Sequence, residues 1–463
     1  MESARLEGQR GGKTRSIRAV VAASFIGTTI EWYDFFLYGT AAALVFDKLF
    51  FPEAEPLVGT LLAFSTYAVG FAARPLGGVV FGHFGDRIGR KTMLVMSLLI
   101  MGTATFLIGC LPTFSAIGIL APILLVVLRF TQGIGVGGEW GGAVLMATEH
   151  APKHRRGFFG SWPQMGVPAG LLLSTVVFKV VEGSMSDSAF ESWGWRVPFL
   201  ASAILVIIGL VIRLKIMESP AFERVKETKT EAERPIVDVV RKYPRDVLTA
   251  MGMRVAENGA FYVLTVFTLA YGEDELGLEK DTMLNGVIAA AAIGLITVPL
   301  WGWLSDRVGR KPLYLAGAII TTLWAFPLFG LMNTAEPFMI ALGIVVGVNL
   351  GHDLMYGPQG AYFSELFGTR VRYSGASLGY QLASVFAGGF APLIATALLA
   401  VGGWELVALY VVAMGLISVV ATLYARETRD VDFDRDEEPE LELVRERRFD
   451  RARFADRETT EVR

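Results

Sequence analysis

Blocks of about 20 predominantly apolar residues recur along the chain, and they restrict its fold more than any other feature does. Residues 93–111, 195–212 and 406–424 are three examples. A helix of this length crosses the ~30 Å hydrocarbon core of a bilayer. Lipid offers no partners to backbone N–H and C=O groups, so each block must be a helix or belong to a closed barrel. Barrel strands are about 10 residues long and alternate in polarity, unlike these blocks. The sequence therefore predicts an all-α integral membrane protein.

The composition excludes several classes of function. Only 19% of the residues are charged, against about 25% in soluble domains. The single cysteine, Cys110, lies in an apolar block, and no histidines are paired at ligand spacing, so we expect neither disulfides nor a metal site. The sequence has no P-loop, HExxH or Ser/His/Asp pattern, and we predict that the protein is not an enzyme and has no nucleic-acid partner.

Twelve transmembrane helices are predicted. Their approximate ranges are 17–43, 57–82, 92–111, 116–147, 157–181, 195–216, 246–271, 283–304, 312–332, 337–364, 374–400 and 404–425. We expect an N-terminal tail (1–16), a six-helix half (17–216), a linker (217–245), a second six-helix half (246–425) and a charged tail (426–463). Most Lys and Arg residues fall in the tails, the linker and one alternating set of loops, which predicts that both termini are cytoplasmic.

A ten-residue string occurs twice at equivalent helix ends. Gly82-His-Phe-Gly-Asp-Arg-Ile-Gly-Arg-Lys91 returns as Gly302-Trp-Leu-Ser-Asp-Arg-Val-Gly-Arg-Lys311, and a looser pair runs from Glu149 to Arg156 and from Glu365 to Arg372. Two six-helix halves related by a parallel repeat are a transporter architecture. Glycines permit a tight turn, and the acid and Arg/Lys side chains can latch neighbouring helix ends. The predicted latch comprises Gly82, Asp86, Arg87, Gly89, Arg90, Asp306, Arg307, Gly309, Arg310, Glu149, Arg156, Glu365 and Arg372. We expect a stronger effect of substitution at Asp86 than at Asp306.

Several strings resemble a known family. The doubled loop and Arg129-Phe-Thr-Gln-Gly-Ile-Gly135 resemble the major facilitator superfamily. The strings Glu31-Trp-Tyr-Asp-Phe35, Gly137-Gly-Glu-Trp-Gly-Gly142, Trp195-Arg-Val-Pro-Phe199 and Glu218-Ser-Pro-Ala-Phe222 are similar to those of its metabolite:H⁺ symporters. That group includes the shikimate, α-ketoglutarate, citrate and proline/betaine permeases of bacteria. The resemblance covers residues 17–425 and implies the major facilitator fold. The fifth span, residues 163–170, partly resembles a motif of the drug/H⁺ antiporters, which leaves antiport as an alternative.

Charges within the predicted spans are candidates for the functional site, because an ionisable group in the membrane is costly. Glu31 and Asp34 are three residues apart on one helix face, and two carboxylates that face one cavity repel each other, which favours uptake of a proton. Arg129 lies near the middle of the fourth span and needs an anion: Asp34, Glu31 or a substrate carboxylate. In the superfamily that this chain resembles, the matching arginine is associated with proton movement. The predicted proton-coupling residues are Glu31, Asp34, Arg129 and Glu139.

Polar side chains also form stripes on the seventh and tenth spans, and we interpret these stripes as facing a water-filled cavity; packing between helices is the alternative. The predicted cavity residues are Tyr38, Gln132, Gln164, Arg254, Glu257, Asn258, Tyr262, His352, Asp353, Tyr356 and Gln359. His352 is interpreted as a hydrogen-bonded structural residue or a proton carrier. Arg74 and Arg196 are predicted to be structural.

The resulting hypothesis is proton-coupled symport of a small organic acid or zwitterion. The alternatives are a drug/H⁺ antiporter and a membrane sensor of the same fold that does not transport. Protons are the only coupling ion expected, and we expect no other cofactor. The expected location is the inner membrane of a bacterium, and the expected partners are a small-molecule substrate and the lipid bilayer; the expected state is a monomer.

Overall fold

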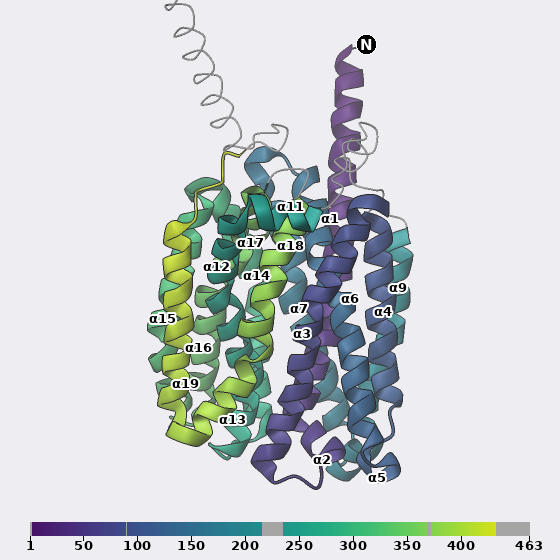
Figure 1. Ribbon diagram of the computed structural model, residues 1–463, viewed down its shortest axis with the longest axis vertical. Coiled ribbons are helices and arrows are strands. Elements are labelled where there is room, and N and C mark those ends of the chain that lie inside the picture. The colour runs from purple at the N-terminus through teal and green to yellow at the C-terminus, as the bar shows by residue number, and fades with distance from the viewer. Residues whose placement is uncertain (1, 89, 215–234, 368–371, 432–463) are drawn as a thin grey trace, which may run out of the picture.

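The structure is a computed structural model that describes residues 2–88, 90–214, 235–367 and 372–431. Within these ranges the side chains of residues 2–16, 18–19, 82–83, 85–88, 90 and 235–238 are not described. The described residues form one bundle of long helices (Figure 1).

Helices α1 to α9 make up what we call the first half. Its long helices are α1 (Glu2–Leu44), α3 (Pro56–Ile88), α4 (Arg90–Cys110), α6 (Leu120–His150), α7 (Arg156–Gly183) and α9 (Arg196–Leu214). Its short elements are α2 (Phe46–Phe50), α5 (Phe114–Ile117), η1 (Lys153–Arg155), α8 (Asp187–Ala189) and η2 (Phe190–Gly194).

The second half runs from α11 to α19, and three of its crossings contain π-helical turns, which are η3, η4 and η5. Its elements are α11 (Pro235–Lys242), α12 (Pro244–Tyr262), η3 (Val263–Phe267), α13 (Thr268–Asp274), α14 (Lys280–Val308), α15 (Arg310–Met332), α16 (Pro337–Val346), η4 (Gly347–His352), α17 (Asp353–Leu366), α18 (Arg372–Ala383), η5 (Ser384–Gly389) and α19 (Ala391–Tyr424). Helices α12, α16 and α18 each continue through a π-turn into the helix that follows.

The twelve predicted crossings are confirmed. Nine helical stretches of the described residues are long and apolar enough to span a membrane. One of them, Arg372–Tyr424, contains two crossings, because Gly402 and Gly403 break the helix and Gly403 has a φ of 75°. The remaining two crossings are α1 and the more polar α12–α13. The predicted ends of the eleventh and twelfth spans flank this glycine pair.

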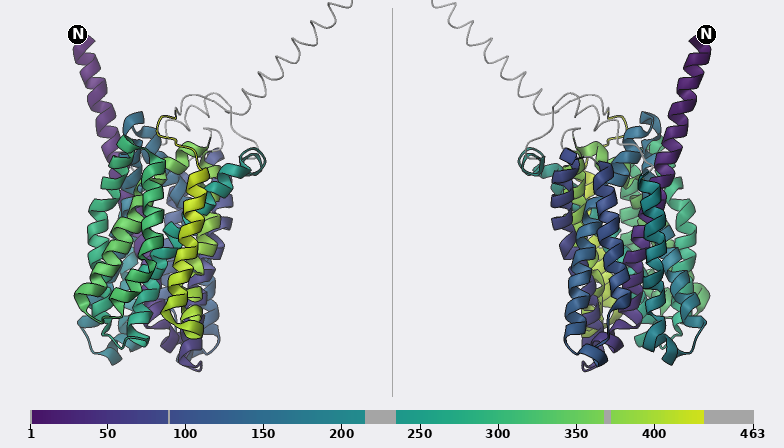
Figure 2. Two further views of the ribbon diagram at one scale, coloured as in Figure 1. Left: turned by 90° about the vertical axis from the view of Figure 1, so that its left-hand side faces the viewer. Right: turned by 90° about the vertical axis from the view of Figure 1, so that its right-hand side faces the viewer.

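The two halves lie side by side, as Figure 1 and the rotated views of Figure 2 show. Their largest contacts are those of α7 with α14 and α17 and those of α3 with α18 and η5. The N terminus and the end of α19 lie at the same end of the bundle, which we call the terminal end; α2 and α5 lie at the opposite end (Figure 1).

Glycines bring α3 and α6 into backbone contact. A Cβ atom on Gly137 would collide with the carbonyl oxygen of Arg74, and one on Gly133 would collide with that of Gly70. Small residues allow this approach of membrane helices, and Gly133 and Gly137 provide it here.

Candidate functional site

A buried arginine from α9 joins two carboxylates from different helices. The Nη2 of Arg213 lies 2.6 Å from Glu31 Oε1 on α1 and also contacts Glu139 Oε1 on α6, while Nη1 donates to the Leu94 carbonyl. All three side chains are at most 4% exposed. We call Glu31, Glu139 and Arg213 the Arg213 cluster. With both acids ionised, it carries a net charge of −1.

Asp34 does not face the same partners as Glu31. Its carboxylate is completely buried next to Thr105, and neither oxygen makes a hydrogen bond of normal geometry to a described residue. The expectation that Glu31 and Asp34 face one cavity is therefore wrong in this conformation, because Glu31 is drawn toward Arg213.

Arg129 has no carboxylate partner among the described side chains. Its Nη1 donates to Gln132, whose Nε2 donates to Thr105 Oγ1 at 2.7 Å. The guanidinium lies over the rings of Phe35 (4.3 Å) and Tyr38 (4.1 Å). The predicted ion pair with Asp34 or Glu31 is thus not formed here; the negative faces of aromatic rings offset part of the buried charge instead.

The predicted stripes on the seventh and tenth spans meet in one network of the second half. Arg254 Nη1 lies 2.7 Å from Glu257 Oε2 and 3.0 Å from Gln359 Oε1. Gln359 also donates to Glu257 and to Tyr314 (both 3.0 Å), and Arg254 Nη2 contacts Asn258 at 3.4 Å. These side chains are packed and hydrogen bonded, which was the alternative to a water-filled cavity.

His352 lies between two acids at the edge of this network. Its Nε2 is 3.3 Å from Glu257 Oε1, and its Nδ1 is 2.8 Å from Asp353 Oδ1. The other carboxylate oxygen of Asp353 accepts from Asn349 at 2.9 Å. A neutral imidazole donates only one hydrogen bond, so this arrangement favours the doubly protonated ring.

Of the other predicted cavity residues, Tyr262 and Gln164 link the two halves, whereas Tyr38 binds within the first half. Tyr262 on α12 packs its ring against Phe35 and Phe71 of the first half. Gln164 on α7 accepts from Trp140 Nε1 (2.7 Å), and its amide nitrogen lies 3.3 Å from the Tyr356 carbonyl and 3.5 Å from Gln359 Oε1. The Tyr38 hydroxyl donates to Thr66 at 2.6 Å.

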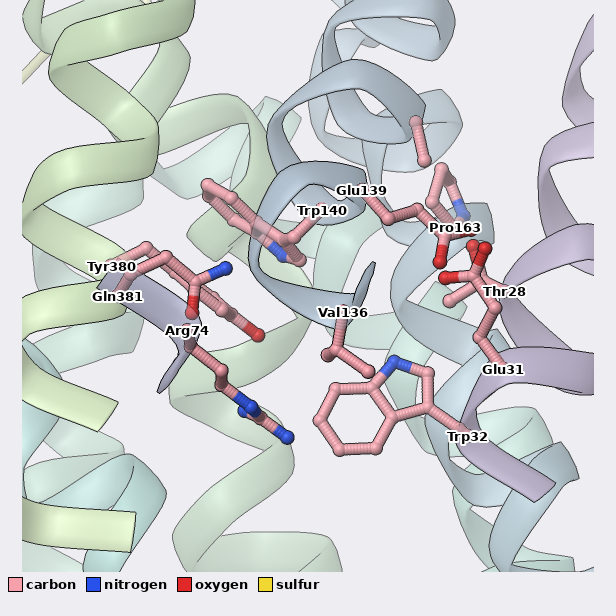
Figure 3. A pocket seen from close by; sticks show the side chains of 11 residues that line it. Thr28, Glu31, Trp32, Arg74, Val136, Glu139, Trp140, Pro163, Tyr380 and Gln381 are labelled. Atoms are coloured by element: carbon pink, nitrogen blue, oxygen red, sulfur yellow. The ribbon is translucent and has the colours of Figure 1, made fainter. Parts of the chain in front are cut away.

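A small pocket lies between the halves. Its volume is about 20 Å³, and its lining comprises Thr28, Glu31, Trp32, Arg74, Val136, Glu139, Trp140, Ala143, Pro163, Tyr380 and Gln381. Figure 3 shows Glu31 and Glu139 on one side and Arg74, Tyr380 and Gln381 on the other. We call this space the central pocket.

Of the predicted site residues, only Glu31 and Glu139 line the central pocket. Sequence reasoning missed Arg74, Arg213, Trp32, Trp140, Tyr380 and Gln381. A signal existed for Arg74, which is an arginine inside an apolar span. For Arg213 there was no such signal, because it stands near the end of its predicted span, beside the basic linker.

The predicted latch of the second half closes the terminal end. Asp306 accepts from the backbone N–H groups of Gly157 and Phe158, in the first turn of α7, at 2.8 Å each. Arg310 binds Asp306 (2.8 Å) and Glu365 (3.3 Å). The turn between α14 and α15 depends on Gly309, whose φ of 107° strongly favours glycine. Arg307 lies over the Trp303 ring at 3.8 Å.

The looser repeat also crosses between the halves. Arg372 Nη1 lies 3.9 Å from Glu149, and Arg156, which donates to the Val431 carbonyl at 2.8 Å, is close enough to Glu365 to interact electrostatically. Each half thus places an acid near an arginine of the other. The first copy of the latch (Gly82, Asp86, Arg87, Gly89 and Arg90) lies outside the described side chains and stays a prediction.

At the opposite end, a groove of about 590 Å³ opens between α1, α7 and α14. Lys179, Glu182, Lys280 and Asp281 are among its lining residues, and Lys179 pairs with Asp281 across the halves at 3.2 Å. Nowhere in the described part of the chain do three His, Cys, Asp or Glu residues gather in a group that could hold a metal ion.

Comparisons with known proteins identify the relatives of this chain. Residues 24–388 match the family model described as Major Facilitator Superfamily. The shikimate transporter of Escherichia coli (strain K12) is 44% identical over 416 residues, which cover 89% of this chain and 95% of that protein. The proline/betaine transporter of the same strain is 34% identical over 425 residues, covering 89% and 84%. A solved structure of a proton:xylose symporter matches with a TM-score of 0.74 at 20% identity, covering 91% of this chain and 98% of the other; it supports the fold alone.

Proposed function

This chain belongs to the Major Facilitator Superfamily and is a membrane transporter, not an enzyme, and we propose that it imports a small organic acid or zwitterionic metabolite together with protons. The relatives named as shikimate and proline/betaine transporters support this substrate class. We further propose that the protein lies in a bacterial inner membrane. This proposal is supported by an inner membrane metabolite transport protein of Escherichia coli (strain K12), which is 43% identical to this chain; the match covers 89% of this chain and 94% of that protein.

The Arg213 cluster is the observation that carries the proposal of proton coupling. Two buried carboxylates share one guanidinium, so one negative charge is left without an ion-pair partner inside the cluster. Burial disfavours such a charge, and a single proton on Glu31 or Glu139 neutralises the cluster. Both acids line the central pocket between the halves, where a bound proton can influence a bound substrate.

Alternating access supplies the transport step. We propose that the terminal end is cytoplasmic, because the basic residues of the loops gather there. The contacts of Asp306 and Arg310 close this end, while the groove marks the opposite, external end. We also propose that the protein functions as a monomer and that protons are its only coupling ion.

Uptake by proteoliposomes tests the proposal. With shikimate or proline as the labelled solute, an acidic exterior should drive accumulation above equilibrium, and a protonophore should abolish it. Exchange of a drug-like cation against an outward proton movement would indicate antiport, and the absence of any flux would indicate a sensor. Either result would overturn symport.

A further inference from the structure

Arg74 is a buried cation that has no hydrogen-bond partner among the described residues. The side chain is completely buried, and its Nε, Nη1 and Nη2 atoms lack a hydrogen bond to any described residue. The guanidinium packs on the rings of Phe71 (4.0 Å) and Phe35 (4.2 Å). Cation–π contacts compensate part of the charge, but they leave its N–H donors unused. A buried donor without an acceptor is costly, so these N–H groups are open to an acceptor from a ligand.

The packing of α3 holds Arg74 at the wall of the central pocket. The backbone of Arg74 touches α6 at Gly137, where any side chain would collide with it. Gln381 of the second half donates to the Gly137 carbonyl at 2.9 Å. Arg74 therefore projects from a fixed backbone position at the boundary between the halves, with Trp32 beside it (Figure 3).

We propose that Arg74 binds the carboxylate group of the transported metabolite. This inference rests on the proposed function and deepens it. A guanidinium offers paired N–H donors that match the two oxygens of a carboxylate. Trp32 and Trp140 of the first half and Tyr380 of the second half supply flat apolar surfaces for the body of the substrate.

Charge compensation within the central pocket would link the substrate to the proton. The carboxylate neutralises Arg74, and the proton neutralises the Arg213 cluster on the opposite side. An anion that binds before the proton adds a second negative charge to the pocket, so binding of the anion favours binding of the proton, and the reverse holds by linkage.

The pocket must enlarge before a metabolite can enter. Its present 20 Å³ is enough for about one water molecule. Tyr380 and Gln381 belong to α18 of the second half, whereas Arg74 and Trp140 belong to the first. Separation of the halves would therefore move one wall away from the other and leave Arg74 on its fixed backbone.

Equilibrium binding to the purified full-length protein in detergent tests the subsite. The probes are shikimate, its uncharged methyl ester, proline and glycine betaine. At least one carboxylate should bind, and if shikimate binds, its ester should bind at least about tenfold more weakly. Arg74→Gln should lower carboxylate affinity at least about tenfold, and Arg74→Lys should retain part of it. The matched control is Arg196→Gln, which removes an arginine outside the pocket.

Thermal unfolding separates a binding role from a structural one. Arg74→Gln removes an unsatisfied buried charge, so the empty variant should unfold at the same temperature as the wild type or higher. Unchanged carboxylate affinity in Arg74→Gln, equal affinity for acid and ester, a lower unfolding temperature, or no binding of any probe to the wild type would each overturn the subsite. Arg74-dependent binding without proton-driven uptake would instead overturn symport and leave the subsite standing.

Discussion

The carboxylate of Asp306 accepts a 2.8 Å hydrogen bond from the backbone N–H of Gly157, so a side chain of the second half closes on the first turn of α7 in the first half. The N terminus of a helix attracts negative charge, which strengthens this contact.

Replacing Asp306 with Asn should weaken the closure of the terminal end. The amide can still accept a hydrogen bond but lacks the charge, and we expect a loss of about 1–2 kcal/mol, which is a roughly 5- to 30-fold shift toward the open state. The labelling rate of a cysteine at Ser161, in a Cys110→Ser background, measures this shift. The exposed Asp430→Asn is the control. Equal labelling rates in Asp306→Asn and the wild type would show that Asp306 does not hold this end closed. The same measurement on Asp86→Asn tests the prediction of a larger effect at Asp86.

Neutralising the Arg213 cluster should uncouple transport from protons. Glu139→Gln and Glu31→Gln should still exchange labelled for unlabelled substrate across the bilayer, since exchange needs no net proton movement. Accumulation against a gradient should fall to the equilibrium level. The exposed Glu405→Gln is the matched control. Loss of exchange together with accumulation would point to a binding or structural role for these acids.

Arg129 and Asp34 should be coupled more weakly than a direct ion pair. No ion pair or hydrogen bond joins them among the described side chains, and Gln132 and Thr105 lie between them, so the changes in unfolding free energy of Arg129→Gln and Asp34→Asn should be closer to additive than those of residues in contact. The pair Arg213→Gln and Glu139→Gln provides the comparison, since residues in contact give about 0.5–3 kcal/mol of non-additivity. Strong coupling between Arg129 and Asp34 would restore the ion pair expected from the sequence.

Adding a methyl group at Gly137 should destabilise the protein. The Cβ atom would meet the backbone of Arg74, which cannot move without shifting α3, and overpacking of this kind costs about 1–3 kcal/mol. Thermal unfolding should therefore begin at a lower temperature. At Gly330 on α15 a Cβ meets nothing within 4 Å, so Gly330→Ala should be neutral or slightly stabilising. Similar behaviour of the two variants would show that the α3–α6 contact tolerates a shift.

The sequence predicted the crossings well because their signal is local. An apolar block of membrane length and the glycines at its end suffice to place a helix, as the boundary at Gly402–Gly403 illustrates. The partners of buried charges were harder to predict because they depend on distant residues. Glu31 pairs with Arg213, which follows it by 182 positions, and helical spacing alone suggested only Asp34 as a neighbour.

The same limit explains the polar stripes. Their spacing correctly placed Arg254 and Glu257 on one face, and the structure adds Gln359 from another helix. Whether such a face meets water or other polar side chains depends on which helix packs against it. The periodicity of one helix gives no information about that neighbour.

The side-chain amide of Gln164 forms hydrogen bonds with both halves. Its oxygen accepts from Trp140 of the first half, and its nitrogen lies 3.3 Å from the Tyr356 carbonyl and 3.5 Å from Gln359 Oε1 of the second half. The long bonds on the nitrogen are neutral and weak, whereas the contacts at the terminal end are short and charged. When the halves separate, α6 and α7 should therefore travel together, and the bonds of Gln164 should add little to the activation barrier. The charged contacts at the rim contribute to that barrier as well, so the turnover rate could be tuned there without changing what the centre recognises.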